Sequence, residues 1–595
     1  MKIKYIDGNR LSRAIIAGAS RIFDRQDYLN KINVFPVPDS DTGTNMASTM
    51  RAIVDSISGT NQPSLSELSN TIAESALLGA RGNSGVILAQ YLYGVAQEIG
   101  DDIHLTTERF GRAVRNAVQY AYNALMTPRE GTILTVMREW SEQIYSQRSN
   151  HTDFAELLNQ ALERANQALS RTTEKIAALR SAKVVDAGAQ GFVDFLEGIT
   201  SFISRGRIKD IQNYSPPKIT GIAHTDTHLE DIKYRYCTEC LIDGKGIDIA
   251  GLKGKIKSFG DSIVVAGSSL MARLHIHTDK PEEVFAIARK SGDLLQQKAD
   301  DMLKQFRVAH AEHARIALVT DSACDLPEKY IDENCIHVVP VRVSFGKSSY
   351  IDKITIKPGQ FYEMLMTESG HPTTSQPPPS DFKNMYSFLL SHYDSIISIH
   401  LTGASSGTYQ NATSAAKMFP DREITVIDGK SLSIGLGFIV EKASQLISEG
   451  RTHSEVVSAV QEFRGKTQMF VNIHSLKYLM RSGRVSKMKG WLGNFLHLKP
   501  ILHLDENGVP QHCEKSFSDS GAMKKVLNLV REFTHGKSNV RFAVAHAKAP
   551  EIADYYVSQL EKTYGVKGIP ILPAAPVLGA HAGIGAGAIA VSWQD

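Results

Sequence analysis

Apolar residues in the first third of the chain recur at intervals of three and four positions, which is the period of an α-helix. Leu11, Ile15 and Ile22 form one such set. Short breaks containing Gly, Pro or Asn separate several segments of helical length, and β-type alternation is scarce. The pattern predicts an all-α domain over residues 1–205.

The pattern changes twice after this domain. Residues 206–232 are polar and include Ser-Pro-Pro, which is typical of a linker. Residues 233–307 mix short apolar runs with helical stretches and predict a small α+β domain. From residue 313 to 595 short β-rich runs alternate with helices, which favours an α/β domain. These runs are Arg315–Thr320, His337–Val343, Ser395–His400, Ile424–Ile427 and Phe542–Ala545. The expected fold class is therefore multidomain.

Composition narrows the functional classes. The 595 residues predict three to five domains, and 42% apolar residues are enough for several cores. A net charge of +3 gives no support to nucleic-acid binding. Five scattered cysteines do not form a disulfide framework. The charged N-terminus lacks a secretory core, and no apolar stretch approaches a membrane span, so we expect a cytoplasmic protein that is at most peripheral to a membrane.

The segment from Asn33 to Met46 carries the most informative motif. Asp39 and Asp41 lie one residue apart in a loop that contains Pro and Gly, ahead of a predicted helix. Clustered carboxylates suit Mg²⁺, and the helix N-terminus adds N–H groups for phosphate. A surface turn with an N-capping Asp is the alternative explanation of this pair.

Three further segments share this character. Gly79–Gly85 contains three glycines, which allow the backbone to approach phosphate closely, and it opens into an apolar helix. It is not a Walker motif, because no Gly-Lys-Ser/Thr follows. The others are Pro128–Thr135 and Val185–Gly191. Each of them alone is also compatible with an ordinary helix boundary.

Together and in this order, the four segments resemble the nucleotide-binding domain of dihydroxyacetone kinases, in the version found in bacterial fatty acid kinases. The resemblance covers residues 1–205 and implies a helical barrel that holds ATP through Mg²⁺. It implies Asp39 and Asp41 as catalytic metal ligands, with Asn33 where dihydroxyacetone kinases have a further metal-binding aspartate. The implied nucleotide contacts also include Thr42, Asn45, Gly82, Asn83, Ser84, Gly85, Thr132, Asp186 and Gly188.

The middle segment contains Cys237, His275 and His277, and the two histidines alternate on a predicted strand so that both project from one face. Such a set supplies three zinc ligands. Two alternatives are a redox pair of Cys237 with Cys240 and ordinary hydrogen-bonded histidines. The segment also resembles the middle domain of fatty acid kinases. That resemblance implies zinc at these residues and a role in docking, including a homodimer, instead of in phosphoryl transfer.

Residues 314–595 resemble the DegV family of fatty-acid-binding proteins. The matching motifs include Thr373-Thr-Ser-Gln-Pro, Ser405-Ser-Gly-Thr-Tyr-Gln and His581-Ala-Gly-Ile-Gly. A fatty acid needs hydrogen-bond donors for its head and a dry wall for its tail. We expect apolar helices at 434–440 and 491–498 to line the tail pocket. The residues expected to bind the head are Thr374, Ser375, Ser406, Gly407, Arg484 and His581.

The combined resemblance implies a kinase that converts ATP and a fatty acid into ADP and an acyl phosphate, with Arg484 assisting the loop aspartates in catalysis. An acyltransferase that uses the acyl phosphate is the implied downstream partner. Two alternatives stay open. One is a kinase for a small hydroxyketone that shares only the ATP domain, and the other is a non-catalytic lipid carrier or sensor.

Overall fold

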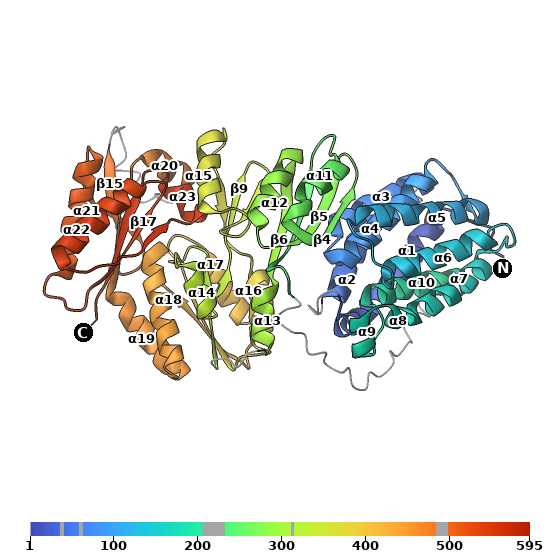
Figure 1. Ribbon diagram of the computed structural model, residues 1–595, viewed down its shortest axis with the longest axis horizontal. Helices are drawn as coiled ribbons and strands as arrows, with labels where there is room; N and C mark the ends of the chain where they lie inside the picture. The colour runs from blue at the N-terminus through green and yellow to red at the C-terminus, as the bar shows by residue number, and fades with distance from the viewer. Residues whose placement is uncertain are drawn as a thin grey trace. The chain divides into compact units, whose positions relative to one another are not determined.

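The computed structural model describes residues 2–35, 41–58, 64–205, 232–310, 315–483 and 498–594. The chain divides into two compact units, residues 1–303 and 304–595. The first unit contains a helical domain followed by a small sheet domain, and the second is an α/β unit (Figure 1). The multidomain fold class predicted from the sequence is therefore confirmed.

The helical domain is built from amphipathic helices around one core. In α1, Ala14, Ile15, Ile22 and Leu29 lie on the buried stripe. The helices are α1 (Gly8–Lys31), α2 (Thr42–Ile57), α3 (Leu65–Gly79), α4 (Gly82–Ile99), α5 (Thr107–Ala124), α6 (Ile133–Gln147), α7 (Phe154–Ser170), α8 (Thr172–Lys175), α9 (Ala177–Ala182) and α10 (Ala187–Arg205). Two short strands, β1 (Tyr5–Ile6) and β2 (Leu105–Thr106), pair antiparallel at its edge.

The small domain of the first unit is an antiparallel sheet in the order β4-β5-β3-β6. Val264 and Ala266 of this sheet belong to the same buried core as the helical domain. The two domains therefore share apolar packing and form one unit. The elements are β3 (Tyr236–Asp243), α11 (Ile249–Ile256), β4 (Gly260–Gly267), β5 (Met271–Thr278), α12 (Pro281–Ala288), β6 (Asp293–Asp301) and α13 (Met302–His310), and α13 spans the division between the units.

The second unit begins with a parallel sheet in the order β13-β12-β7-β8 and a small antiparallel sheet in the order β10-β9-β11. Four of the five β-rich runs expected from the sequence coincide with single strands of this unit, except that Arg315 precedes its strand. The run His337–Val343 is divided into two strands, because Pro340 has no backbone N–H to donate to a sheet. Its first elements are β7 (Ile316–Asp321), α14 (Glu328–Glu333), β8 (His337–Val339), β9 (Arg342–Phe345), β10 (Ser348–Ile351), α15 (Pro358–Thr367), β11 (Thr373–Ser375), α16 (Pro379–Leu389), β12 (Ser395–His400), α17 (Thr408–Ala416) and β13 (Glu423–Asp428).

A larger mixed sheet follows, in the order β16-β15-β14-β19-β17-β18. Its elements are α18 (Ser433–Ser448), α19 (His453–Gly465), β14 (Thr467–Asn472), α20 (Leu476–Ser482), β15 (Lys499–Leu504), β16 (Pro510–Ser516), α21 (Asp519–Thr534), β17 (Arg541–His546), α22 (Pro550–Tyr564), β18 (Ile571–Pro573), α23 (Pro576–Ala582) and β19 (Gly587–Ser592).

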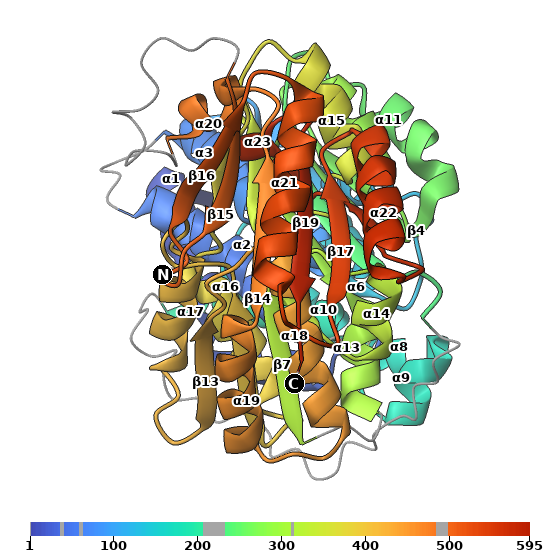
Figure 2. The same ribbon diagram turned by 90° about the vertical axis from the view of Figure 1, so that its left-hand side faces the viewer.

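Alternation along β17 explains how this sheet is covered on both faces. Phe542 and Val544 pack in one core with residues of α21 and α22. Ala543 and Ala545 point to the opposite face, where they pack with Phe438 of α18. Figure 2 shows α21 and α22 lying over one face of the sheet. Among the described residues, every helix falls short of the length or the apolar character that crossing a bilayer requires.

Candidate active site

Four helices of the first unit begin at the wall of one cavity of about 500 Å³. They are α2, α4, α6 and α10, whose first residues lie far apart in the sequence. The first N–H groups of a helix have no partner within the helix, and the helix dipole makes this end attractive to anions. Four such ends around one cavity are suited to a polyanion. The four ends contribute Asp41, Thr42 and Asn45; Gly82, Asn83 and Ser84; Thr132 and Ile133; and Asp186 and Gly188.

Two glycines allow these helix ends to approach one another. Gly82 has a φ of +56°, and a Cβ built on it would lie 2.3 Å from the side-chain nitrogen of Asn45. A Cβ on Gly188 would lie 2.6 Å from the hydroxyl of Ser84. A side chain at either position would therefore displace the Asn45 or the Ser84 side chain at the cavity wall. Gly85 lies further into α4, where it faces Thr49, and it is not part of the cavity wall.

Asp186 holds the start of α10. Its Oδ1 accepts a hydrogen bond of 2.8 Å from the backbone N–H of Ala189. The carboxylate also accepts a hydrogen bond from the backbone of Ile133 at the start of α6. Burial raises the pKa of Asp186 to about 6, although both of these hydrogen bonds act to lower it. One side chain thus fixes the relative position of two of the four helix ends.

The expected magnesium ligands lie on the α2 side of the cavity. Asp41 and Asn33 both line the wall. The Asp41 carboxylate lies 3.9 Å from the Lys298 ammonium, which also forms an ion pair of 2.6 Å with Asp300. Asp39 lies outside the described residues, so its role as a metal ligand stays a prediction.

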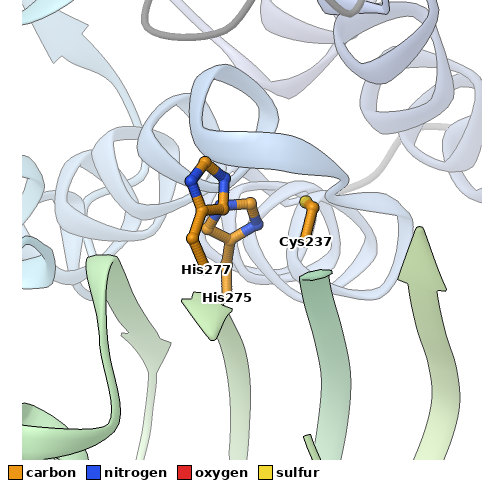
Figure 3. A group of neighbouring side chains, drawn as sticks. All are labelled: Cys237, His275 and His277. Atoms are coloured by element: carbon orange, nitrogen blue, oxygen red, sulfur yellow. The ribbon is translucent and has the colours of Figure 1, made fainter. Parts of the chain in front are cut away.

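Cys237, His275 and His277 form a cluster on the sheet domain (Figure 3). In the antiparallel pair of β3 and β5, Cys237 is directly opposite His277. His275 is two residues away from His277 and projects from the same face. One ligand atom from each side chain lies within 4.8 Å of the others, and all three residues are buried.

The chemistry of this cluster fits a zinc ion. The Nε2 atom of His275 is buried and makes no hydrogen bond, while its Nδ1 lies 3.1 Å from Glu239. Burial and the neighbouring His275 lower the pKa of His277 to about 3, although Glu239 acts to raise it. Neutral imidazoles and a cysteine are ligands that zinc prefers, and a metal ligand of this kind explains an otherwise costly unpaired buried nitrogen.

The location of the cluster bears on two expectations. All three side chains line the same cavity as the four helix ends, so their location does not favour a role in docking alone. Cys240 is three positions from Cys237 on β3 and therefore projects from the other face of the strand. Burial raises the pKa of the Cys240 thiol to about 12, which disfavours the reactive thiolate. A redox pair with Cys237 is thus ruled out.

The second unit contains a cavity of about 400 Å³ whose wall is mostly apolar. Its apolar residues come from β14, β15, α20 and α23, among other elements. None of the described residues that line it is acidic. The polar residues in the wall are Thr374, Ser375, Gln376, Ser405, Ser406, His503 and His581.

Several of these polar groups are joined by hydrogen bonds. The hydroxyl of Thr374 lies 3.1 Å from Nε2 of His581. Gln376 accepts a hydrogen bond of 3.1 Å from the backbone N–H of Gly407, and this contact places the Gly407 loop beside β11. The Ser406 hydroxyl lies 2.8 Å from the hydroxyl of Thr408. The structure therefore brings Thr374, Ser406 and His581 to one cavity, as the sequence predicts.

One prediction about the wall of this cavity is wrong, and others fall on residues that the structure does not describe. The segment 434–440 does not line the wall; it lies in α18, where Ile434 and Phe438 pack against the large sheet. Arg484 lies outside the described residues, as does most of the segment 491–498. The role of Arg484 stays a prediction.

Three known protein families match successive parts of the chain that contains the two cavities. Residues 36–201 match the DAK2 domain, residues 233–309 the FakA-like middle domain of fatty acid kinase, and residues 315–594 the uncharacterised DegV family. This order of domains is similar to that of fatty acid kinases.

Two solved structures are similar to the part of the chain that matches the DegV family. A fatty-acid-binding DegV family protein from Thermus thermophilus is 29% identical and covers 47% of this chain and 100% of its own, with a TM-score of 0.45. DegV of Bacillus subtilis, a fatty acid binding protein, is 30% identical with the same coverages and TM-score.

Curated relatives match a similar share of the chain. An uncharacterized protein of Staphylococcus epidermidis is 32% identical over 316 residues, which are 51% of this chain and 57% of the relative. An uncharacterized protein of Staphylococcus aureus (strain USA300) is 32% identical over 317 residues, with the same two coverages. The chain thus spans little more than half the length of these relatives.

Sequence reasoning missed two residues beside the Cys237 cluster and one in the DegV domain. Glu239 belongs to β3 and is buried against the start of α4. It lies two residues after Cys237, so both side chains project from one face of the strand, and this spacing could have indicated that Glu239 adjoins the cluster. Lys298 lies near Asp41 through packing of β6 against the helical domain, which no local pattern reveals. Gln376 belongs to the Thr373-Thr-Ser-Gln-Pro motif, but its contact with Gly407 depends on the fold.

Proposed function

We propose that the chain is a fatty acid kinase, which transfers the γ-phosphoryl group of ATP to the carboxylate of a bound fatty acid. The observation that carries the proposal is the convergence of four helix N-termini on one cavity of a DAK2 domain. The same chain carries a DegV domain with a largely apolar cavity. One cavity suits a nucleotide, and the other suits an acyl chain.

In the nucleotide cavity, the residues have separable roles. Asp39 and Asp41 would hold Mg²⁺, and Asn33 offers a further oxygen ligand. Asn45, Asn83, Ser84 and Thr132 offer hydrogen bonds to the nucleotide, in addition to the N–H groups of the helix ends. Magnesium supplies neutralisation of the charge that develops as the phosphoryl group moves.

Cys237, His275 and His277 would hold zinc at the wall of this cavity. Zinc supplies additional positive charge there and fixes three side chains of the sheet domain. The helical domain contributes the remainder of the wall, so a metal at this cluster bears on the geometry of the nucleotide site.

In the lipid cavity, the absence of acidic residues among those described favours an anionic head, since a carboxylate in the wall would repel it. Thr374, Ser406 and His581 offer hydrogen bonds to a fatty acid carboxylate, and Arg484 would add a charged donor. The apolar remainder of the wall excludes water from the tail.

The reaction balances without a general base. A carboxylate oxygen forms a bond to the γ-phosphorus, the bond between that phosphorus and the bridging oxygen breaks, and ADP leaves as the second product. The acceptor is already an anion, so no proton has to be removed. Positioning and charge neutralisation are therefore sufficient. The product, a mixed anhydride, would be consumed by an acyltransferase.

The test is trapping of the product. Purified chain is incubated with ATP, Mg²⁺ and saturated or unsaturated fatty acids of several lengths, and hydroxylamine converts acyl phosphate into a hydroxamate. We expect hydroxamate only when ATP and fatty acid are both present. Consumption of ATP with dihydroxyacetone, and no hydroxamate with any fatty acid, would establish a hydroxyketone kinase instead. Fatty acid that co-purifies with a chain unable to consume ATP would establish a lipid carrier.

A further inference from the structure

A single oxygen atom connects the Cys237, His275 and His277 cluster to the start of α4. Oε1 of Glu239 accepts a hydrogen bond of 2.6 Å from the backbone N–H of Gly82. The same Oε1 lies 3.1 Å from Nδ1 of His275. Glu239 is 1% exposed, so water does not compete for either contact.

The second contact fixes how His275 can bind a metal. Because a carboxylate only accepts hydrogen bonds, Nδ1 of His275 carries the proton, and Nε2 presents its lone pair. That Nε2 is the buried atom without a hydrogen bond. A carboxylate that orients a histidine in this way raises its basicity as a ligand, and its loss typically weakens metal binding about 10- to 100-fold.

The first contact fixes how α4 presents its N–H groups. Gly82 is the first residue of α4 and lies in the wall of the cavity with Asn83 and Ser84. With the Gly82 N–H occupied by Glu239, the N–H groups and side chains that follow are left to face the cavity. The carboxylate thereby sets the orientation of the α4 end toward a nucleotide.

We propose that Glu239 is a positioning residue that couples metal binding at Cys237, His275 and His277 to nucleotide binding at the start of α4. The inference rests on the proposed function, because it takes the cavity to be the nucleotide site. A shift of His275 on metal binding moves the shared oxygen, and the shared oxygen moves Gly82. By linkage, the metal and the nucleotide then raise each other's affinity by the same factor, and such factors are typically about 5- to 150-fold.

The experiment measures binding and not turnover. Zinc affinity is determined by competition with a chromogenic chelator, and the affinity for the Mg²⁺ complex of AMP-PNP by calorimetry, in zinc-loaded and zinc-stripped full-length chain. The wild type is expected to bind AMP-PNP at least about fivefold more tightly when zinc is present. Equal affinities in the two forms would overturn the coupling.

Two substitutions of Glu239 distinguish a role in positioning His275 and Gly82 from a merely structural role. Glu239→Ala removes both contacts, so zinc affinity should fall about 10- to 100-fold and nucleotide affinity should cease to depend on zinc. Glu239→Gln keeps an oxygen that accepts both hydrogen bonds, so it should retain the zinc dependence. Glu283→Ala is the matched control, since Glu283 lies in the same domain and pairs only at the surface with Lys280.

The outcomes distinguish this inference from the proposed function. If the protein binds both zinc and AMP-PNP but the two affinities are independent, the coupling is contradicted and the proposed kinase function is not. If it binds no AMP-PNP with or without zinc, both the coupling and the proposed function are contradicted. If Glu239→Ala does not fold, the wild-type comparison and Glu239→Gln still decide the question, and loss of zinc dependence in the Gln variant would contradict the role of the shared oxygen.

Discussion

Replacing Gly188 by Ala is expected to damage nucleotide binding while leaving the protein folded. Gly188 lies at the start of α10, and a Cβ there would be 2.6 Å from Oγ and 3.3 Å from Cβ of Ser84. The close atom is the end of a short side chain that can rotate, so the backbone need not move. Relief therefore comes from a change in the Ser84 rotamer, which redirects the hydroxyl at the cavity wall.

The two effects of this substitution differ in size. Forcing Ser84 from its preferred rotamer costs about 0.5–1.5 kcal/mol, and Ala favours a helix over Gly by about 0.5–1 kcal/mol, so the free energy of unfolding should change by less than about 1 kcal/mol. A hydrogen bond to a charged phosphate contributes about 1.5–3 kcal/mol. Its loss should raise the Kd for nucleotide roughly 10- to 100-fold.

Two other glycines provide matched controls. Gly254 lies in α11, and a Cβ added to it would have no atom within 4 Å, so Gly254→Ala should leave nucleotide binding unchanged and raise stability by at most about 0.5–1 kcal/mol. At Gly198 a Cβ would lie 2.4 Å from the backbone oxygen of Ala17, which cannot yield. Gly198→Ala should therefore lose about 1–3 kcal/mol of stability through overpacking, with nucleotide affinity unchanged in the folded protein.

The assay is titration with the Mg²⁺ complex of AMP-PNP, together with thermal unfolding of each variant. Unchanged nucleotide affinity in Gly188→Ala would refute the contact between Ser84 and the nucleotide. A loss of stability as large as that of Gly198→Ala would show that the backbone moves, and the rotamer argument would then be wrong.

Substitutions at the metal, lipid and buried acidic sites test three other expectations. Asp41→Asn should reduce acyl phosphate formation at least about tenfold, because it removes a carboxylate assigned to magnesium, although it also removes a partner of Lys298. Fatty acid should still co-purify, because the lipid cavity lies in the other unit. Hydroxamate trapping measures the first effect and mass spectrometry the second, and loss of both would contradict separate sites. Thr374→Ala combined with Ser406→Ala should weaken fatty acid binding about tenfold or more and leave AMP-PNP affinity unchanged, as measured by displacement of a fluorescent fatty acid. Burial raises the pKa of Asp352 to about 7 from its ordinary 3.8, although Lys353 acts to lower it, so its folded pKa exceeds its unfolded pKa. Stability of the second unit should therefore decrease as pH rises from about 4 to 7. Asp352→Asn should make the unfolding temperature depend less on pH over this range. An unchanged pH dependence in this variant would refute the raised pKa of Asp352.

The hydrophobic pattern was sufficient for the elements but not for their packing partners. The spacing of Leu11, Ile15 and Ile22 predicts the buried face of α1, and the run Ser395–His400 coincides with β12. The run 434–440 was correctly predicted as helical, but its assignment to the lipid cavity was wrong. An apolar run indicates burial and does not indicate whether the side chains contact a sheet or a ligand.

The nucleotide segments were found one by one, because each combines Gly or Asp with a helix start. Their meeting at a single cavity depends on contacts between segments such as Ser84 and Gly188, which are distant in the chain. The position of the metal cluster depends further on packing of the small sheet against the helical domain, where Val264 joins the helical core. Local spacing contains no information about that packing, so the sequence does not predict that the cluster shares a cavity with the helix ends.

Transfer of a phosphoryl group to a fatty acid places opposite demands on a protein. Phosphates need many hydrogen-bond donors and positive charge, whereas an acyl chain needs a wall that water does not enter. A single cavity that met both demands would leave donors unpaired against the tail, and each unpaired buried donor costs about 1–3 kcal/mol. Here the helix ends, Asp41 and the Cys237 cluster are confined to the first unit, and the apolar cavity with its few linked hydroxyls lies in the second. Because the lipid cavity has Thr374 and His581 but no acidic group among its described residues, it favours an acceptor that arrives already ionised. A bound carboxylate needs no base to remove a proton, and Thr374 and His581 offer it hydrogen bonds, so the apolar remainder of the wall is left for an acyl tail that a small hydroxyketone lacks.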